Sequence, residues 1–112
     1  EVSQPRSPCS NLDRRHNARG LARHMAKSGR TGWLYRTLEP GVVRPGTALQ
    51  LVERPCPAAS VLRIWRGFMN EDVSDTELDW LAGLLPLASE CRTRFRQRLD
   101  SRRQQQDQGA LF

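Results

Sequence analysis

The chain has 112 residues, enough for one ordinary domain or two very small ones, and its 18 Lys and Arg against 12 Asp and Glu give a net charge of +6. The sequence has no apolar run long enough to cross a bilayer, which excludes a membrane-spanning helix, and we expect no membrane partner. The excess positive charge belongs entirely to residues 1–58, so we expect this half to attract an anion.

The first segment, residues 1–6, is predicted to end a strand that enters a rigid loop at Pro5. Cys9 follows behind two prolines, which hold the backbone stiff and extended. The cation of Arg6, three residues away, favours the thiolate, the form of cysteine that binds metals and acts as a nucleophile. Cys9 is therefore a candidate metal ligand, and the alternative is a buried, inert cysteine in a turn.

A helix is predicted over residues 17–28, with Asn17 as its N-cap and Gly29 as its C-terminal stop. One face of this helix is strongly basic. We interpret it as a solvated face, with a phosphate-tracking surface as the alternative. The cations of this face are Arg15, Arg19 and Arg23.

Residues 31–38 are rich in aromatic and β-branched side chains and predict a strand. Turns containing Pro and Gly follow, and the alternation of residues 47–54 predicts another strand. Because two strands and a short helix cannot bury both faces of a sheet, we expect this half to need strands from elsewhere. The first residue is Glu1 rather than Met, which agrees with a chain that is the C-terminal part of a longer protein.

Beyond a linker at residues 55–59, apolar side chains no longer recur at every second residue but about every 3.6 residues. This spacing predicts three short helices. Ser60 is expected to cap the first helix, which is broken at residues 70–73. Ser74 and Glu77 form a capping box that opens the second: the Ser74 side chain accepts from the Glu77 amide, and the Glu77 carboxylate reaches back to Ser74.

The third helix is expected to begin near Pro86, and residues 102–108 are expected to fray into a disordered tail because they have no apolar seam. The apolar seam of the helix consists of Ala88, Cys91, Phe95 and Leu99. The three cysteines of the chain (Cys9, Cys56 and Cys91) are widely spaced and odd in number, which argues against a disulfide framework and a zinc site and favours a reducing compartment, the cytoplasm.

In combination, these motifs resemble the MOSC domain, the C-terminal fold of molybdenum-cofactor sulfurases, in its YiiM-like branch, which is associated with resistance to hydroxylaminopurine base analogues. The resemblance is carried by Gln4-Pro5-Arg6-Ser7-Pro8-Cys9, by residues 29–36, 38–41 and 45–55, and by residues 61–99, which are similar to the small three-helix domain of that branch. Two features depart from the family: the region that supplies the other half of its barrel is absent, and the predicted helix at residues 17–28 is unusually rich in arginine.

The resemblance implies an α+β fold, a partial MOSC-type β-barrel of strands and a short helix followed by a small three-helix domain. The expected division is residues 1–55 for the barrel part, 60–106 for the three-helix domain and 107–112 for a disordered tail.

The resemblance also implies that Cys9 is the protein ligand of molybdenum in a molybdopterin cofactor, since a soft thiolate suits a soft metal. Arg6 and Arg30 would bind anionic groups of the cofactor, and Ser7 would donate a hydrogen bond to it or shape the turn. At the level of the family, pyridoxal phosphate binding is implied as well.

The implied activity is reduction of N-hydroxylated bases or related N-oxygenated compounds, a detoxification, with electrons from a separate reductase. We expect the fragment alone to be inactive, and the oligomeric state stays open, with a homodimer as one option. The alternative function is a non-catalytic binding module whose basic first half contacts nucleic acid or another anion and whose three helices dock a partner protein. Against nucleic acid, the helical half is neutral and has no recognition-helix motif.

Overall fold

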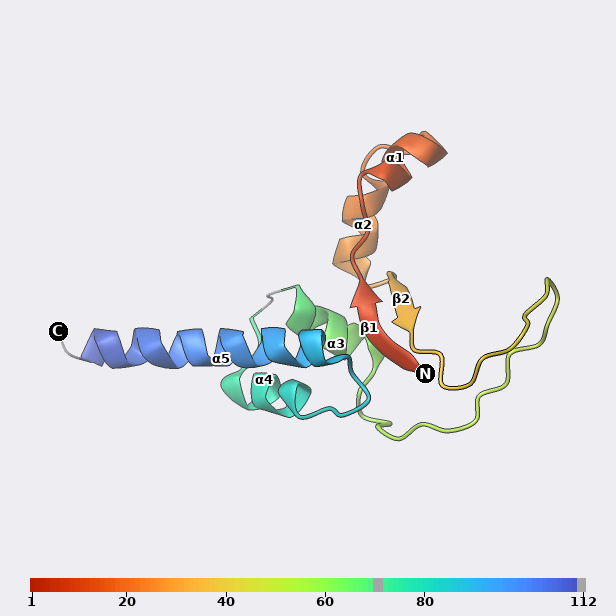
Figure 1. Cartoon of the computed structure of the whole chain (residues 1–112). Coiled ribbons are helices and arrows are strands. Elements are labelled where there is room, and N and C mark those ends of the chain that lie inside the picture. The colour runs from red at the N-terminus through yellow and green to blue at the C-terminus, as the bar shows by residue number, and fades with distance from the viewer. Residues whose placement is uncertain (70–71, 111–112) are drawn as a thin grey trace.

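In the computed structural model, which describes residues 1–69 and 72–110, β1 (Val2–Arg6) pairs antiparallel with β2 (Gly32–Tyr35) (Figure 1). The register places Arg6 opposite Gly32 at one end and Val2 opposite Tyr35 at the other. The open end of the pair is closed by an ion pair of 2.9 Å between Arg36 and Glu1. Both strands lie where the sequence predicts them, and the mixed α+β class is confirmed.

The segment between the strands holds two helices, α1 (Asn11–His16) and α2 (Leu21–Ser28), where one was predicted. The prediction of Asn17 as an N-cap is wrong, because Asn17 has a left-handed φ of 48° and ends α1 instead. Asp13 instead provides acceptors for the amides at the start of α2: its carboxylate accepts hydrogen bonds from the amides of Gly20 and Ala22, at 2.7 and 2.8 Å. These amides, Ala22 foremost, hold the pKa of Asp13 below its usual value.

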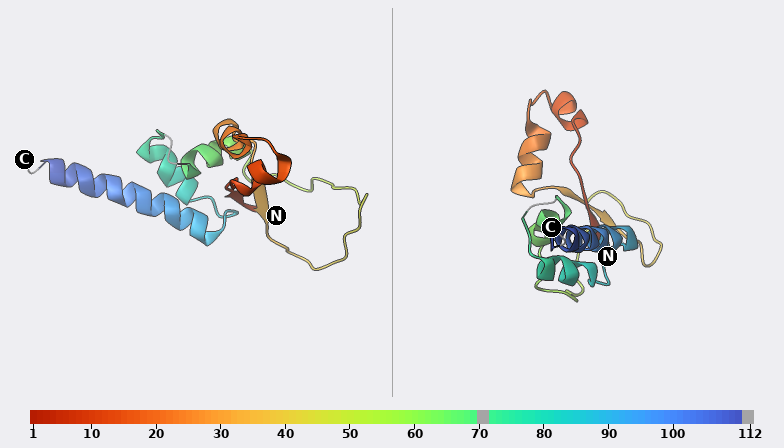
Figure 2. Two further views of the ribbon diagram at one scale, coloured as in Figure 1. Left: turned by 90° about the horizontal axis from the view of Figure 1, so that it is seen from above. Right: turned by 90° about the vertical axis from the view of Figure 1, so that its left-hand side faces the viewer.

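The strand predicted over residues 47–54 is not formed, and residues 36–60 run as an irregular segment away from the body (Figures 1 and 2). Leu49 and Leu51 are 96% and 66% exposed. A strand needs a partner for its backbone hydrogen bonds, and no other strand of the described chain lies alongside this segment. The alternation is present in the sequence, but the pairing that would turn it into a strand is missing.

The second half forms α3 (Val61–Phe68), α4 (Asp75–Ala82) and α5 (Ser89–Ala110). Two helix starts are confirmed, since Ser60 accepts from the amide of Arg63 and Ser74 from that of Glu77. The expected break at residues 70–73 falls partly on residues 70–71, which lie outside the described residues.

The prediction of a helix start at Pro86 is wrong, because α5 begins at Ser89 and residues 84–88 form the connection. The helix also continues through Ala110, past the residues expected to fray. Arg102, at the start of the expected tail, donates a hydrogen bond to the carbonyl of Val73 at 2.6 Å and so attaches α5 to the segment before α4. The glutamines that follow are good helix formers. Residues 111–112 of the expected tail lie outside the described residues.

The hydrophobic core lies entirely in the helical half. Its buried side chains come from α3, α4, α5 and the connection between the last two: Ile64, Trp65, Leu78, Leu81, Ala82, Leu84, Leu87, Cys91, Phe95 and Leu99. Gly67 lets α3 approach the other helices closely, since a Cβ there would overlap Leu81 and press on Phe95. Among the described helices, none is both long and apolar enough to span a membrane.

Hydrogen bonds attach the first half to the helical half. The indole of Trp65 donates to the carbonyl of Ala26 at 2.7 Å, and the amide of Ala88 donates to the carbonyl of Ser3 at 2.8 Å. Gly29 packs against the same helix α3 as Trp65. The strands are therefore fixed on the helical body, while α1 and the far end of α2 project from it (Figures 1 and 2).

Candidate functional site

The candidate ligand Cys9 lies in the turn between β1 and α1, and its side chain is exposed. Its carbonyl accepts from the amide of Leu12 at 2.9 Å, and its Sγ accepts from the amide of Asn11 at 3.4 Å. The turn thus fixes the sulfur from the backbone side and leaves it open to solvent. The alternative of a buried, inert cysteine does not apply to Cys9.

The two candidate cations Arg6 and Arg30 lie at the same end of the strand pair. Arg6 is the last residue of β1 and faces Gly32, and Arg30 precedes Gly32 by two residues. Both side chains are exposed, as is that of Ser7, which follows β1 directly. The antiparallel pairing therefore places Arg6, Ser7 and Arg30 at the same end of the strand pair, from which the chain continues to Cys9.

A further cation near the sulfur was missed by the sequence analysis. Arg14 donates to Oδ1 of Asn11, the residue whose amide donates to Cys9 Sγ, so one residue links the guanidinium to the sulfur. Residues three positions apart are neighbours on a helix, so a helix predicted over residues 11–16 would have placed Arg14 beside Asn11. This helix was not predicted because α1 is short and has no buried side chain.

The other two sulfurs have different surroundings. Cys91 is 2% exposed in the core, and burial raises the pKa of its thiol to about 11. Cys56 is half-buried in the irregular segment. Of the three thiols, Cys9 is the one that is exposed to solvent, which is a requirement for binding a ligand from solution.

Within the described residues, no three His, Cys, Asp or Glu side chains gather closely enough to hold a metal ion between them. A bare metal ion that takes most of its ligands from protein therefore has no such cluster among the described residues. A metal that brings its own ligands and needs one protein sulfur fits the exposed Cys9, with Arg6 and Arg30 available for anionic groups.

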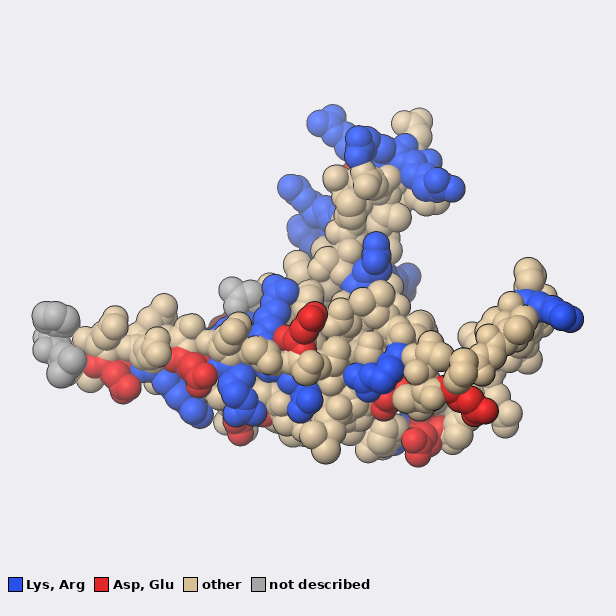
Figure 3. All heavy atoms as spheres, in the orientation of Figure 1, with Lys and Arg blue, Asp and Glu red and all other residues tan. Residues whose placement is uncertain are grey.

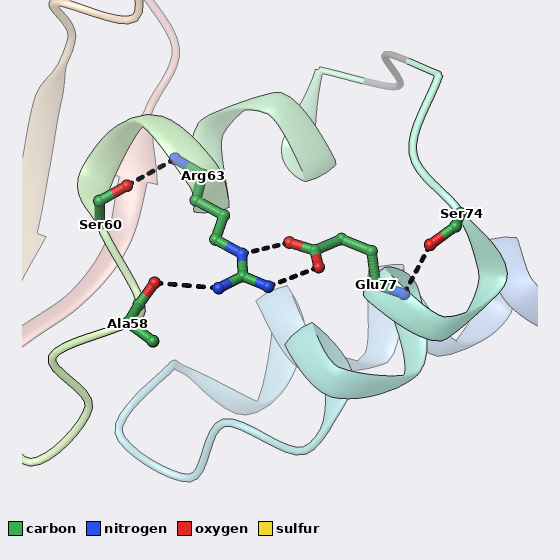
Figure 4. Close-up of polar contacts among 5 residues, drawn as sticks. All are labelled: Ala58, Ser60, Arg63, Ser74 and Glu77. Atoms are coloured by element: carbon green, nitrogen blue, oxygen red, sulfur yellow. Dashed lines mark hydrogen bonds and ion pairs between the residues drawn. The ribbon is translucent and has the colours of Figure 1, made fainter.

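A second polar cluster lies between α3 and α4 (Figure 4). It lines an open hollow of ≈ 620 Å³. Arg63 donates to both carboxylate oxygens of Glu77, at 2.5 and 2.7 Å, and to the carbonyl of Ala58 at 3.2 Å. Its guanidinium also lies over the ring of Trp80, 3.9 Å from the centroid. The Glu77 carboxylate therefore faces Arg63 with both oxygens, and the predicted reach back to Ser74 is replaced by an ion pair between helices.

The hydrogen bonds from Arg63 hold the pKa of Glu77 below its usual value, and the same bonds raise the pKa of Arg63. Both charged groups are thus committed to each other, which is typical of a structural ion pair rather than of a catalytic one. We assign this cluster to the joining of α3 and α4.

Comparison with known proteins gives a consistent relationship. Residues 1–50 match the MOSC domain family model. The chain is 43% identical over 54 residues to Protein YiiM of Escherichia coli strain K12 (48% of this chain and 24% of that protein). It is 38% identical over 74 residues to a protein named Reductase of Gibberella moniliformis (66% of this chain and 13% of that protein).

A solved structure shares the fold as well. The crystal structure of YiiM from Geobacillus stearothermophilus superposes with a TM-score of 0.78 at 34% identity, and the match covers 88% of this chain and 51% of that one. The segments matched to the two curated proteins cover 24% or less of their lengths. The chain thus spans only part of the length of the proteins that it matches.

Proposed function

Because this chain is a MOSC/YiiM-like protein, we propose that it is the part of a molybdenum-cofactor oxidoreductase that supplies the metal-binding cysteine, Cys9. The observation that carries the proposal is the state of this sulfur: it is exposed, the amide of Asn11 donates to it, and the amide of Leu12 donates to the carbonyl of the same residue. A sulfur held in this way can bind a large ligand without any movement of the core.

The candidate residues fit the cofactor by their chemistry. Arg6 and Arg30 would bind its phosphate, because a guanidinium can donate two parallel hydrogen bonds to phosphate oxygens. Ser7 lies between Arg6 and Cys9 and would donate a hydrogen bond to a cofactor oxygen. The exposure of these side chains leaves room for a cofactor and for further elements of a longer protein.

The proposed reaction is the reduction of N-hydroxylated bases or related N–O compounds. The bound cofactor would supply the two-electron chemistry by which an N–OH group and two protons become N–H and water. The electrons would come from a separate reductase, in the reducing cytoplasm that suits three free cysteines. Within this chain, Cys9 would hold the metal, and Arg6 and Arg30 would hold the anionic groups of the cofactor.

The test is an activity assay on the whole protein that contains this chain, made in a host that synthesises the cofactor. An N-hydroxylated purine is the substrate and a chemical reductant is the electron donor. We expect turnover by the wild type and by the matched control Cys56→Ala, and its loss in Cys9→Ala. Turnover by Cys9→Ala at the wild-type rate would contradict the proposal.

A further inference from the structure

The segment at residues 10–30, which contains α1 and α2 and is called the basic arm below, concentrates positive charge on an exposed projection (Figure 3). It holds one acidic residue, Asp13, and that carboxylate is occupied by the amides of Gly20 and Ala22. The exposed cations of the arm are Arg14, Arg15, Arg19, Arg23, Lys27 and Arg30. Their charge is therefore not balanced from within the arm.

Two of the cations share one face of α2. Arg23 and Lys27 are four residues apart in the helix, about 6 Å along its axis. Arg19 precedes α2, and the left-handed φ of 84° at Gly20 separates it from the helix, so it adds charge to the arm without extending this face. Two cations on one face with further cations in the same arm suit a ligand with more than one phosphate better than a ligand with a single charge.

Cys9 directly precedes the arm, in the turn that leads into α1. The amide of Asn11 donates to the sulfur and its side chain accepts from Arg14, so the first turn of α1 joins thiol and cation. A ligand drawn into the positive potential of the arm is thereby brought toward the sulfur. Fields of this kind raise the association rate of anions by about 10- to 1000-fold at low salt.

We propose that the basic arm binds the phosphates of the substrate, so that the N-hydroxylated base is taken as a nucleoside polyphosphate rather than as the free base. This inference rests on the proposed function, which assigns Arg6 and Arg30 to the cofactor and leaves Arg15, Arg19, Arg23 and Lys27 for the substrate. The arm contains no Phe, Tyr or Trp. Single-stranded nucleic acid is commonly bound through aromatic stacking, so its absence favours a ligand held by phosphates alone.

The experiment measures calorimetric binding of ATP, inorganic triphosphate, adenosine and a short oligothymidylate to the full chain at low and at moderate salt. The variant Arg23→Gln/Lys27→Gln removes two charges from the arm. The matched control Arg96→Gln/Arg103→Gln removes two charges from exposed positions of α5. Circular dichroism checks that each variant stays folded.

We expect ATP and triphosphate to bind and adenosine not to bind, with ATP affinity about tenfold weaker in the arm variant and within about twofold of wild type in the control. Adenosine binding as tight as ATP, equal losses in both variants, or no binding of ATP would overturn the inference. Much tighter binding of the oligothymidylate would overturn it in favour of a nucleic-acid surface.

The assay needs no molybdenum, which separates the two proposals. If ATP binding is lost while molybdenum still depends on Cys9, only the role of the arm is wrong. If ATP binds but molybdenum is held without Cys9, the proposed function is wrong and the arm remains a polyphosphate-binding surface.

Discussion

The indole Nε1 of Trp65 donates a hydrogen bond of 2.7 Å to the carbonyl oxygen of Ala26, which joins α3 to the C-terminal turn of α2. The carbonyls in the last turn of a helix have no partner within the helix, so this donor satisfies a group that would otherwise need water. Trp65 itself is 1% exposed. The basic arm is thus tied to the hydrophobic core through one buried side chain.

Replacing Trp65 by Phe keeps an aromatic ring in the core and removes the donor. We expect a loss of about 1 kcal/mol in the free energy of unfolding and faster amide hydrogen exchange in α2. Trp33→Phe is the control, because the buried Nε1 of Trp33 has no hydrogen-bond partner among the described residues. Exchange in α2 that stays at the wild-type rate in Trp65→Phe would show that the arm is held by other contacts.

Gly29 is required at the end of α2 for two reasons. Its φ is +70°, and a Cβ at this position would lie 2.5 Å from Cδ1 of Leu62. We expect Gly29→Ala to cost at least about 1–2 kcal/mol, seen as a lower midpoint of urea unfolding. Gly41→Ala is the matched control, because nothing lies within 4 Å of a Cβ there. Equal midpoints for the two variants would contradict the packing of α2 on α3.

The elements that the sequence predicts well are those specified by neighbouring residues. Ser60 and Ser74 begin helices through bonds to amides three residues on, and Gly29 ends one through its left-handed backbone. Asn17 was misassigned because the same residue type suits an N-cap and a left-handed C-cap, and its neighbours do not decide between them.

Features that depend on contacts between residues far apart in the sequence could not be predicted from local patterns. The alternation at residues 47–54 could not become a strand without a partner, and the pairing of Arg63 with Glu77 joins residues fourteen positions apart. At the candidate site, Cys9 and Arg6 could be singled out from their local motif. Predicting that Arg6 and Arg30 lie at the same end of the strand pair required the register of the two strands. Predicting the position of Arg14 required helix α1, which has no buried side chain and therefore no apolar pattern in the sequence.

The ion pair between Arg63 and Glu77 should make stability depend on pH in the acid range. Because the pKa of Glu77 is lower in the folded chain than in the unfolded one, its stabilisation is present above the unfolded value of about 4.5. It is lost as the pH falls through the folded-state value. We expect Glu77→Gln to be less stable than wild type near neutral pH, with a difference that shrinks toward zero in acid.

The control for this prediction is Asp79→Asn, which removes an exposed carboxylate from the same helix. Urea unfolding of the three proteins across the acid range provides the measurement. A gap between wild type and Glu77→Gln that is constant with pH would show that the pair does not stabilise the chain through charge.

The three thiols should differ in their reactivity toward an aromatic disulfide reagent at about pH 8. Cys9 is exposed and should react first, whereas burial and a pKa raised to about 11 should protect Cys91 until the chain unfolds. The variant Cys9→Ser should remove the fast phase alone, and Cys91→Ala should leave it unchanged. A fast phase that survives in Cys9→Ser would place the accessible sulfur elsewhere.

The most direct measurement is the molybdenum content of the whole protein, purified from a cofactor-producing host and determined by elemental mass spectrometry. We expect one metal per chain in the wild type and in Cys56→Ala, and its loss in Cys9→Ala and Cys9→Ser, because neither replacement offers a thiolate. Stoichiometric molybdenum in folded Cys9→Ala would contradict the central claim that this exposed sulfur is the protein's ligand to the metal.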